Sequence, residues 1–318
     1  MLTEFFTQNQ LLLNIMIVIA SLYLMAKAAD FAVLGVSRYA QKLGLSDCII
    51  GMLVIAVVSS MPEFIASVTG GVLGESGIAI GSLLGASLAG LGLVIGIIAI
   101  VHKKVITNSK IIQETNFLIW ILLMLPFILM FDGKLSRIDG LIMIMSFIVY
   151  TIILWKKEGT FGKIKKDIRL KHLWKDGLIF SLSLVVILLT ARYLVFSCMM
   201  IANMLKIPAY FLALTVIAIG ATMPDIMIGL KSIKQKHGGI GYGNIIGSMV
   251  VHLLFLGIIV ILTPLTFEIS SFLNLIIIFV LMVTSVLIWS KKGFLTRTQG
   301  ISLLIVYILF ILIQLLVH

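Results

Sequence analysis

The chain is too apolar for a soluble protein. Of its 318 residues, 61% are hydrophobic and only 12% are charged, and the mean hydropathy is +1.21. Soluble domains are about 45–50% apolar and about 25% charged, so these values exclude a soluble domain and predict an all-α polytopic membrane protein. The net charge of +11 fits either a nucleic-acid partner or basic membrane loops, and the positions of Lys and Arg distinguish the two.

Ten apolar runs are long enough to cross a bilayer. A membrane-spanning helix needs about 20 predominantly apolar residues, and this measure predicts helices at residues 9–37, 46–73, 78–101, 111–131, 136–155, 177–205, 208–232, 240–264, 270–290 and 296–317. A polar, basic segment separates two groups of five helices. We therefore expect a first five-helix repeat at residues 1–155, a basic cytoplasmic connector at 156–176 and a second five-helix repeat at 177–318.

The two groups of helices repeat one another in sequence. The shift in numbering that aligns Met61-Pro62-Glu63 with Met223-Pro224-Asp225 also aligns the glycines at 81 and 85 with those at 243 and 247. We call this shift the repeat offset. Because each repeat holds an odd number of helices, the second must enter the membrane from the opposite side. The sequence thus predicts two inverted repeats, which in transporters place the binding site near the membrane midplane.

The basic residues indicate how the chain is oriented. Of the 24 Lys and Arg, 19 fall in the loops on one side of the ten predicted helices, eight of them in the connector. The positive-inside rule makes this side cytoplasmic, so we expect a multi-pass cell-membrane protein with both termini outside the cytoplasm. The basic connector is expected to contact anionic lipids of the bilayer. Topology therefore accounts for the net charge, and no nucleic-acid partner is predicted.

Each repeat carries one acid directly behind a proline in an apolar run. Glu63 is the only formal charge between Gly51 and Leu73, and Asp225 follows Pro224 in the same way. A charge at membrane depth costs about 2.5–3.5 kcal/mol on insertion scales. Proline also leaves a helical carbonyl without its donor. Hard cations such as Ca²⁺ take about six to eight oxygen ligands, so buried carboxylates and freed carbonyls predict a cation site.

Small and hydroxyl residues precede both acids, and further polar residues lie on the eighth predicted helix. Hydroxyl groups and backbone carbonyls next to the prolines are expected to complete the oxygen shell. The candidate metal ligands are Glu63, Asp225, Ser59, Ser60, Ala221, Thr222, Ser248 and His252.

One more pair of charges lies at membrane depth. Asp30 and Arg192 are aligned by the same repeat offset, on the first and sixth predicted helices. We interpret them as a buried ion pair across the repeats, with Lys27 as a competing partner for Asp30. A direct role of the pair in transport is the alternative.

These motifs resemble the calcium/cation antiporter superfamily, specifically the prokaryotic type of its sodium/calcium exchanger branch. The resemblance covers essentially the whole chain and is strongest over Gly51–Gly96 and Ala213–Gly257. In both blocks, a hydroxyl-x-Pro-acid core is followed by a Gly-x-x-x-Gly motif, and the spacing from the proline to the first of these glycines is the same.

The resemblance implies ten helices in inverted repeats and an ion site at the membrane midplane between helices two, three, seven and eight. The first and sixth helices would slide across the core to alternate access. Glu63 and Asp225 would be the central Ca²⁺ ligands. The carbonyls of Ser59 and Ala221 would assist them, and the hydroxyls of Ser60 and Thr222 would serve Na⁺.

The chain departs from the family pattern at several ligand positions. Ala86 stands where serine is usual, Gly90 and Met249 where asparagine is usual, and His252 where Asn or Asp is usual. These departures leave the counter-ion open. His252 is expected to project near Asp225, and an imidazole, with an unperturbed pKa of about 6.5, suggests coupling of Ca²⁺ movement to protons. The alternative is that His252 merely hydrogen-bonds a neighbour.

The sequence therefore predicts a secondary active antiporter that exchanges Ca²⁺ for a monovalent cation, with Na⁺ the favoured ion. The alternatives are a Ca²⁺/H⁺ antiporter and a degenerate membrane protein that binds a cation without transporting it. The chain has no nucleophile–base set, His/Cys metal cluster or nucleotide motif, so we predict neither enzymatic activity nor a cofactor. We expect a monomer.

Overall fold

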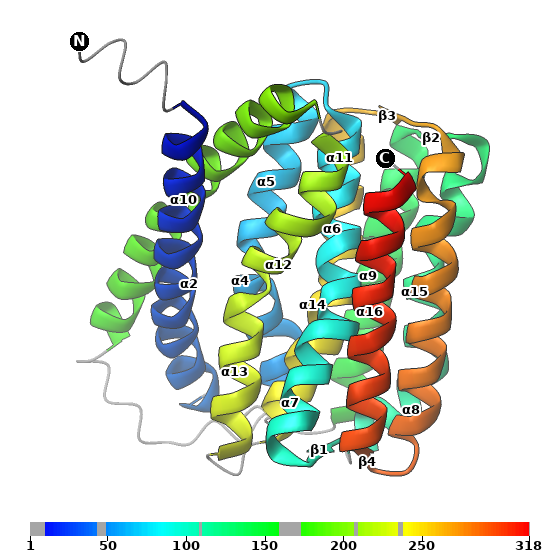
Figure 1. The fold of residues 1–318 in the computed structure, drawn as a ribbon. Coiled ribbons are helices and arrows are strands. Elements are labelled where there is room, and N and C mark those ends of the chain that lie inside the picture. Colours follow the sequence, from blue (N-terminus) through cyan, green and yellow to red (C-terminus); the bar gives the residue numbers. More distant parts are fainter. Residues whose placement is uncertain are drawn as a thin grey trace.

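The computed structural model describes residues 10–42, 49–107, 110–158, 173–206, 209–234 and 238–317. These residues form a bundle of helices, several of which run roughly along one axis (Figure 1). Most of the predicted connector lies outside the described residues, which include only positions 156–158 and 173–176 of it.

In the first half of the chain, the helices follow the predicted apolar runs, but the second and third are divided into shorter elements. The elements are α2 (Gln10–Lys42), η1 (Ile50–Ile55), α4 (Ala56–Ser59), α5 (Met61–Val72), α6 (Ser76–Ala89), η2 (Gly90–Val94), α7 (Ile95–His102), β1 (Lys104–Ile106), α8 (Lys110–Leu129), η3 (Met130–Asp132), β2 (Lys134–Leu135) and α9 (Arg137–Glu158).

The second half has a similar order. Its elements are α10 (Leu173–Leu205), α11 (Ala209–Leu212), η5 (Ala213–Ile217), α12 (Ala218–Ala221), α13 (Met223–Lys234), α14 (Gly238–Leu262), β3 (Leu265–Thr266), α15 (Ile269–Ser290), β4 (Phe294–Thr296) and α16 (Arg297–Val317). The segments η1, η2 and η5 are π-helical and η3 is a 3-10 helix. The second half differs from the first in that a short helix, α11, precedes its π-helical segment and α14 is not divided.

Some element bounds are equivalent in the two halves. The repeat offset relates both ends of α4 to those of α12, and both ends of α5 to those of α13. The long helices α2 and α10 have 33 residues each. In Figure 1, α4 and α5 lead upward, whereas α12 and α13 lead downward, so the two broken helices run in opposite directions.

A proline accounts for each break. Pro62 is the second residue of α5 and has no amide hydrogen to continue the helical ladder. The backbone leaves helical geometry at Ser60 (φ −88°, ψ 4°), and the chain bends by 50° between Gly51–Ser59 and Met61–Val72. A π-helical segment precedes the break in both halves, and such segments are frequent at functional sites.

Much of the described chain is suited to span a membrane. Seven of its helices are long and apolar enough, and the bent pair Gly51–Ser59 and Met61–Val72 makes an eighth if it counts as one span. Apolar stretches in α2 (Gln10–Met25) and α10 (Arg192–Leu205) are shorter. The chain is therefore a mostly helical, multi-pass membrane protein.

Two pairs of glycines let helices approach closely in a reciprocal way. A Cβ added to Gly85 would lie 2.9 Å from the carbonyl oxygen of Leu214 in η5, and one added to Gly247 would lie closer still to the backbone of Met52 in η1. The repeat offset relates both members of one contact to those of the other. Small residues permit such close backbone contacts between membrane helices, so α6 and α14 pack tightly against the broken helices.

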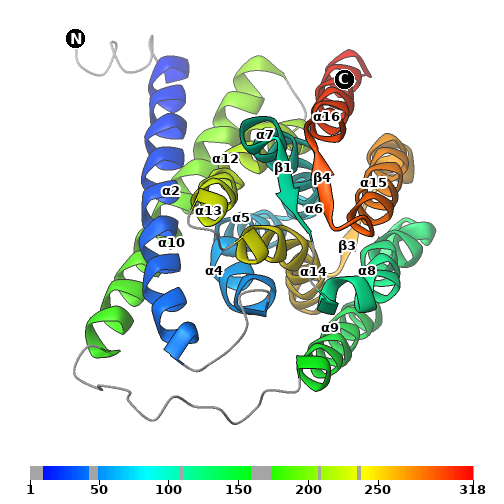
Figure 2. The ribbon, with the colours of Figure 1, turned by 90° about the horizontal axis from the view of Figure 1, so that it is seen from below.

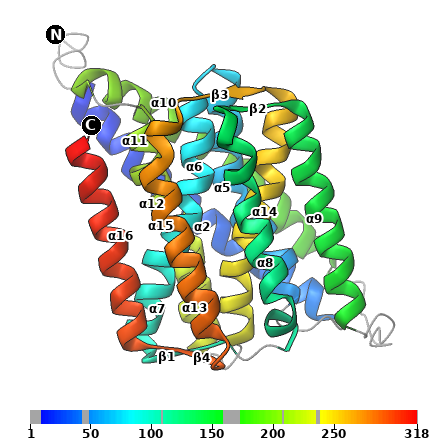
Figure 3. The same cartoon turned by 90° about the vertical axis from the view of Figure 1, so that its right-hand side faces the viewer.

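The broken helices, α6 and α14 form the middle of the bundle. The pair α2 and α10 packs together along one side (Figure 2), and α16, α15, α8 and α9 stand side by side on another (Figure 3). Two short antiparallel ladders close the ends, β1 with β4 and β2 with β3. Buried side chains concentrate along α6 and α14, which places the candidate site at the most enclosed part of the molecule.

Candidate cation site

The two breaks carry the predicted acids into the interior. Glu63 is the third residue of α5 and Asp225 the third of α13, and only 1% and 4% of their surfaces are exposed. Asn244 connects Asp225 to Ser59, which lies one helical turn before Glu63. Each acid lies in the first turn of its helix, where the partial positive charge of the helix dipole favours a carboxylate. Within the described residues, no basic side chain forms a salt bridge with either acid.

A hydrogen-bond network orients Asp225. Asn244 of α14 donates from Nδ2 to Asp225 Oδ1 at 2.7 Å, and its own Oδ1 accepts a bond from Ser59 Oγ at 3.2 Å. The hydroxyls of Ser59 and Ser248 lie 3.4 Å apart. One amide therefore links the break of α4–α5, the first turn of α13 and the middle of α14.

Two oxygen atoms beside the first break have no hydrogen-bond partner within the described structure, namely Glu63 Oε2 and Ser60 Oγ. Both residues are almost fully buried, where an unsatisfied polar group normally costs about 1–3 kcal/mol. A bound cation would coordinate such atoms. The residues present thus fit a hard cation.

At the second break, the predicted residues are buried as well. Ala221 and Thr222 are each 1% exposed. The hydroxyl of Thr222 donates to the Ile219 carbonyl at 3.0 Å, which leaves its oxygen lone pairs for a cation. Among the residues that the structure describes, no three His, Cys, Asp or Glu side chains form a metal cluster. Carboxylate, hydroxyl and carbonyl oxygens suit Na⁺ and Ca²⁺ better than transition metals.

His252 is directed elsewhere than we expect from the sequence. Its Nδ1 lies 2.7 Å from Ser87 Oγ of α6, not against Asp225. The Ser87 hydroxyl also lies 3.0 Å from the Leu83 carbonyl oxygen, and the tautomer of His252 sets which group donates in the Ser87–His252 bond. His252 Nε2 has no partner in the described chain and lines a small cavity beside Pro126 of α8. The structure therefore shows the alternative that we gave for His252, a hydrogen bond to a neighbouring side chain.

The departures from the family pattern have a structural counterpart. Gly90 begins η2, and a Cβ added there would lie 3.5 Å from the methyl carbon of Met249. Met249 and Ala86 are buried apolar side chains. Apolar groups therefore occupy positions at which oxygen ligands are usual in the family pattern.

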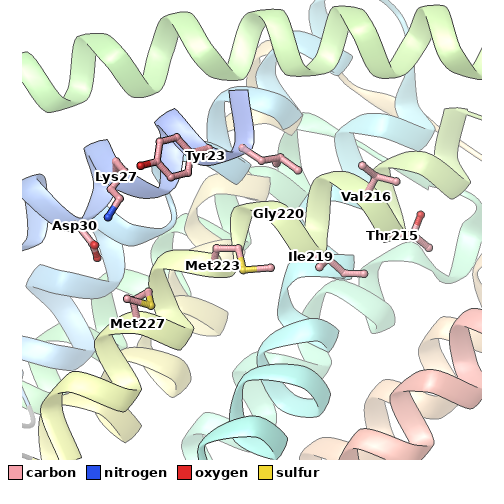
Figure 4. Close-up of a pocket in the computed structure, with 10 residues that line it drawn as sticks. Tyr23, Lys27, Asp30, Thr215, Val216, Ile219, Gly220, Met223 and Met227 are labelled. Carbon is pink, nitrogen blue, oxygen red and sulfur yellow. The ribbon is translucent and has the colours of Figure 1, made fainter. Parts of the chain in front are cut away.

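Asp30 and Arg192 do not form the ion pair that their alignment suggests. Asp30 lines a cavity of about 580 Å³ between α2 and the chain from η5 to α13, together with Lys27 and Tyr23 (Figure 4). Arg192 lines a different cavity between α5 and α10. No salt bridge joins the two side chains in the described part of the chain.

Comparison with known proteins decides the family. The model of the family described as sodium/calcium exchanger protein matches residues 13–156 and 176–316. The chain belongs to this family. Its members are membrane transporters, and the family exchanges Ca²⁺ and Na⁺.

Several exchanger relatives resemble the chain along nearly its whole length. It is 23% identical to the sodium/calcium exchanger MaX1 of Methanosarcina acetivorans, over 94% of this chain and 98% of the relative. It is 28% identical to an uncharacterized membrane protein of Methanocaldococcus jannaschii, over 94% and 97%. A solved structure of the sodium-calcium exchanger NCX_Mj, soaked with 10 mM Na⁺ and zero Ca²⁺, superposes with a TM-score of 0.76 at 26% identity, over 95% of this chain and 99% of that one.

Proposed function

We propose that this exchanger moves Ca²⁺ across the cell membrane in exchange for Na⁺. The observation that carries the proposal is the pair of buried carboxylates, Glu63 and Asp225, each behind a proline, with Asn244 joining Asp225 to the break before Glu63. Their two negative charges balance one Ca²⁺ or two Na⁺. Because uncompensated charge at membrane depth is costly, the site can close only when cations fill it. That requirement couples the release of one ion to the binding of the other.

The proposed ion site lies at the membrane midplane, between the broken helices α4–α5 and α12–α13 and the central helices α6 and α14. Ten membrane helices in two inverted repeats supply it. The repeated element bounds, the opposite directions of the two broken helices and the reciprocal glycine contacts support this arrangement. All proposed ligands belong to one chain, and we propose that the monomer is the functional unit.

Alternating access is assigned to α2 and α10. These helices pack on each other and against the broken helices, while their outer faces expose apolar side chains such as Leu12 and Leu182 to lipid. A pair attached mainly through one face can move across the core without breaking the central network. The first described residue of α2 and the last of α16 lie near the same end of the bundle (Figure 1), which we place outside the cytoplasm.

The direction of His252 favours Na⁺ over H⁺ as the counter-ion. The imidazole is hydrogen-bonded to Ser87 of α6 and lines a cavity beside α8, and no hydrogen bond between it and either acid is found among the described residues. A proton taken up there would not balance the charge at Glu63 and Asp225. A Ca²⁺/H⁺ antiporter and a binding protein without transport remain the two alternatives, and one experiment separates all three.

The test is uptake of radioactive Ca²⁺ into proteoliposomes that hold the purified full-length chain. An outward Na⁺ gradient, an outward H⁺ gradient and no gradient are compared at one internal buffer composition. We expect uptake with the Na⁺ gradient alone. Uptake driven only by H⁺ would replace the proposal with Ca²⁺/H⁺ exchange, and Ca²⁺ binding without uptake under either gradient would leave a binding protein.

A further inference from the structure

A cavity of about 800 Å³ between α5 and α10 holds a guanidinium among apolar side chains. It is lined by residues of both helices, including Val68, Val72, Leu189, Arg192, Tyr193 and Phe196. Leu189 and Phe196 are 56% and 60% exposed, and Val72 is 71% exposed. Exposed apolar side chains around a cavity of this kind suit the acyl chain of a lipid.

Within the described part of the chain, no acidic side chain balances the charge in this cavity. Neither Asp nor Glu is among the residues that line it, and Arg192 has no salt bridge or hydrogen bond among the described residues. The other basic residue within a predicted helix, Lys27, has an acid in its cavity and an aromatic ring beside it. Asp30 lines the same cavity as Lys27, whose Nζ lies 5.9 Å from the centre of the Tyr23 ring (Figure 4). A cation at membrane depth requires a partner, and no residue that the structure describes supplies one for Arg192.

The position of the cavity fits one leaflet of a bilayer. Along α5 it extends from Ile65 to Leu73, or about 12 Å at ~1.5 Å per residue. The hydrocarbon of one leaflet is about 15 Å thick. Leu73 ends α5, and the chain turns at Gly74, which has φ +79°, toward α6. The cavity therefore begins where α5 leaves the membrane and extends inward by nearly one leaflet.

We propose that one anionic phospholipid binds in this cavity. Its phosphate is held by the guanidinium of Arg192, which can donate two parallel hydrogen bonds to phosphate oxygens, and by the hydroxyl of Tyr193. One acyl chain runs inward along Val68, Ile65 and Leu189, away from the end of α5 at Leu73. This lipid lies between α5, which carries Glu63, and α10. If the proposed function holds, α10 moves during transport, and the lipid therefore affects the rate of exchange.

The test measures lipid binding rather than transport. Purified protein in detergent is titrated with dioleoyl phosphatidylglycerol or with dioleoyl phosphatidylcholine, and the adducts are counted by native mass spectrometry. We expect the wild type to prefer phosphatidylglycerol. Arg192→Gln should weaken that binding about fivefold, the effect of one basic side chain at an anionic lipid surface. The matched control Lys27→Gln should bind as the wild type does.

Equal binding of the two lipids by the wild type, or an unchanged preference in Arg192→Gln, would overturn the proposal. Tighter binding of oleate than of phosphatidylglycerol would contradict it too, because a fatty acid would then be the occupant. If Arg192→Gln fails to fold, the wild-type comparison of the two lipids decides alone. The lipid-binding experiment involves no ion gradient, so a negative result would not affect the proposal of Ca²⁺ exchange. A negative result in the Ca²⁺ uptake experiment would likewise not affect the proposal of lipid binding.

Discussion

Replacing Asn244 by leucine tests the geometry of the cation site without changing its formal charge. The amide of Asn244 donates to Asp225 at 2.7 Å and accepts from Ser59 at 3.2 Å. Leucine has nearly the same size and can do neither. The variant therefore removes the one side chain that connects the three helices around Asp225.

The size of the effect follows from the lost bond to a carboxylate. A hydrogen bond to a charged group contributes about 1.5–3 kcal/mol, which corresponds to about a 10- to 150-fold change in affinity. The loss falls on the Ca²⁺-bound state, because Ca²⁺ requires an ionised Asp225 while the empty site can hold a proton instead. We therefore expect Asn244→Leu to weaken Ca²⁺ binding by a factor in this range.

Equilibrium binding of radioactive Ca²⁺ to the purified protein measures this factor. Asn116→Leu is the matched control, since Asn116 of α8 is also buried and donates to the Leu287 carbonyl at 2.9 Å. That bond joins α8 to α15, away from the acids, so its loss should lower stability and leave Ca²⁺ affinity unchanged. If folded Asn244→Leu bound Ca²⁺ as tightly as Asn116→Leu, the proposed role of the network would be refuted.

Three further substitutions have distinct expected outcomes. Ser60→Ala should leave the melting temperature close to that of the wild type, because the hydroxyl has no hydrogen-bond partner among the described residues to lose. The same variant should weaken the competition of Na⁺ with Ca²⁺ for binding. Unchanged competition would show that Ser60 is not a ligand of the site. His252→Gln should keep the wild-type pH dependence of Ca²⁺ uptake, and a shifted profile would revive proton coupling. Gly257→Ala should lower the melting temperature, because its Cβ would lie 2.8 Å from the Gly140 carbonyl oxygen and overpacking costs about 1–3 kcal/mol. Gly177→Ala is the control, because a Cβ there would have nothing within 4 Å. Equal melting temperatures of the two variants would contradict the close approach of the helices at Gly257.

The features that could be predicted from the sequence are those with a local chemical cause. A proline in an apolar run removes a hydrogen bond wherever it stands, so both breaks and the placement of Glu63 and Asp225 behind them follow from the residues alone. The repeat was equally accessible, because the repeat offset relates the motifs and also the observed bounds of α4 with α12 and α5 with α13.

Side-chain direction was not accessible in the same way. His252 and Ser248 are one turn apart on α14, yet one bonds Ser87 and the other lies beside Ser59. Which neighbour each meets depends on how α14 is rotated and on where the glycines let other helices approach. Asn244 was missing from the candidate ligands for the same reason, although its polarity at membrane depth was a signal.

The Asp30 and Arg192 prediction was wrong for a reason of symmetry. A repeat offset identifies residues in equivalent environments of two different halves, and such residues meet only near the axis that relates the halves. The two side chains instead line different cavities, one beside α12–α13 and one beside α5. Equivalence in sequence therefore carried no information on their contact.

The most direct test of the central claim is Na⁺-gradient-driven Ca²⁺ uptake by Glu63→Gln and Asp225→Asn, each beside Glu75→Gln. Glu75 is a half-buried acid at the turn after α5 and takes no part in the site. We predict that both site variants lose uptake while Glu75→Gln retains it. Uptake that survived in a folded Glu63→Gln or Asp225→Asn variant would contradict the claim that these two carboxylates carry the exchanged ions.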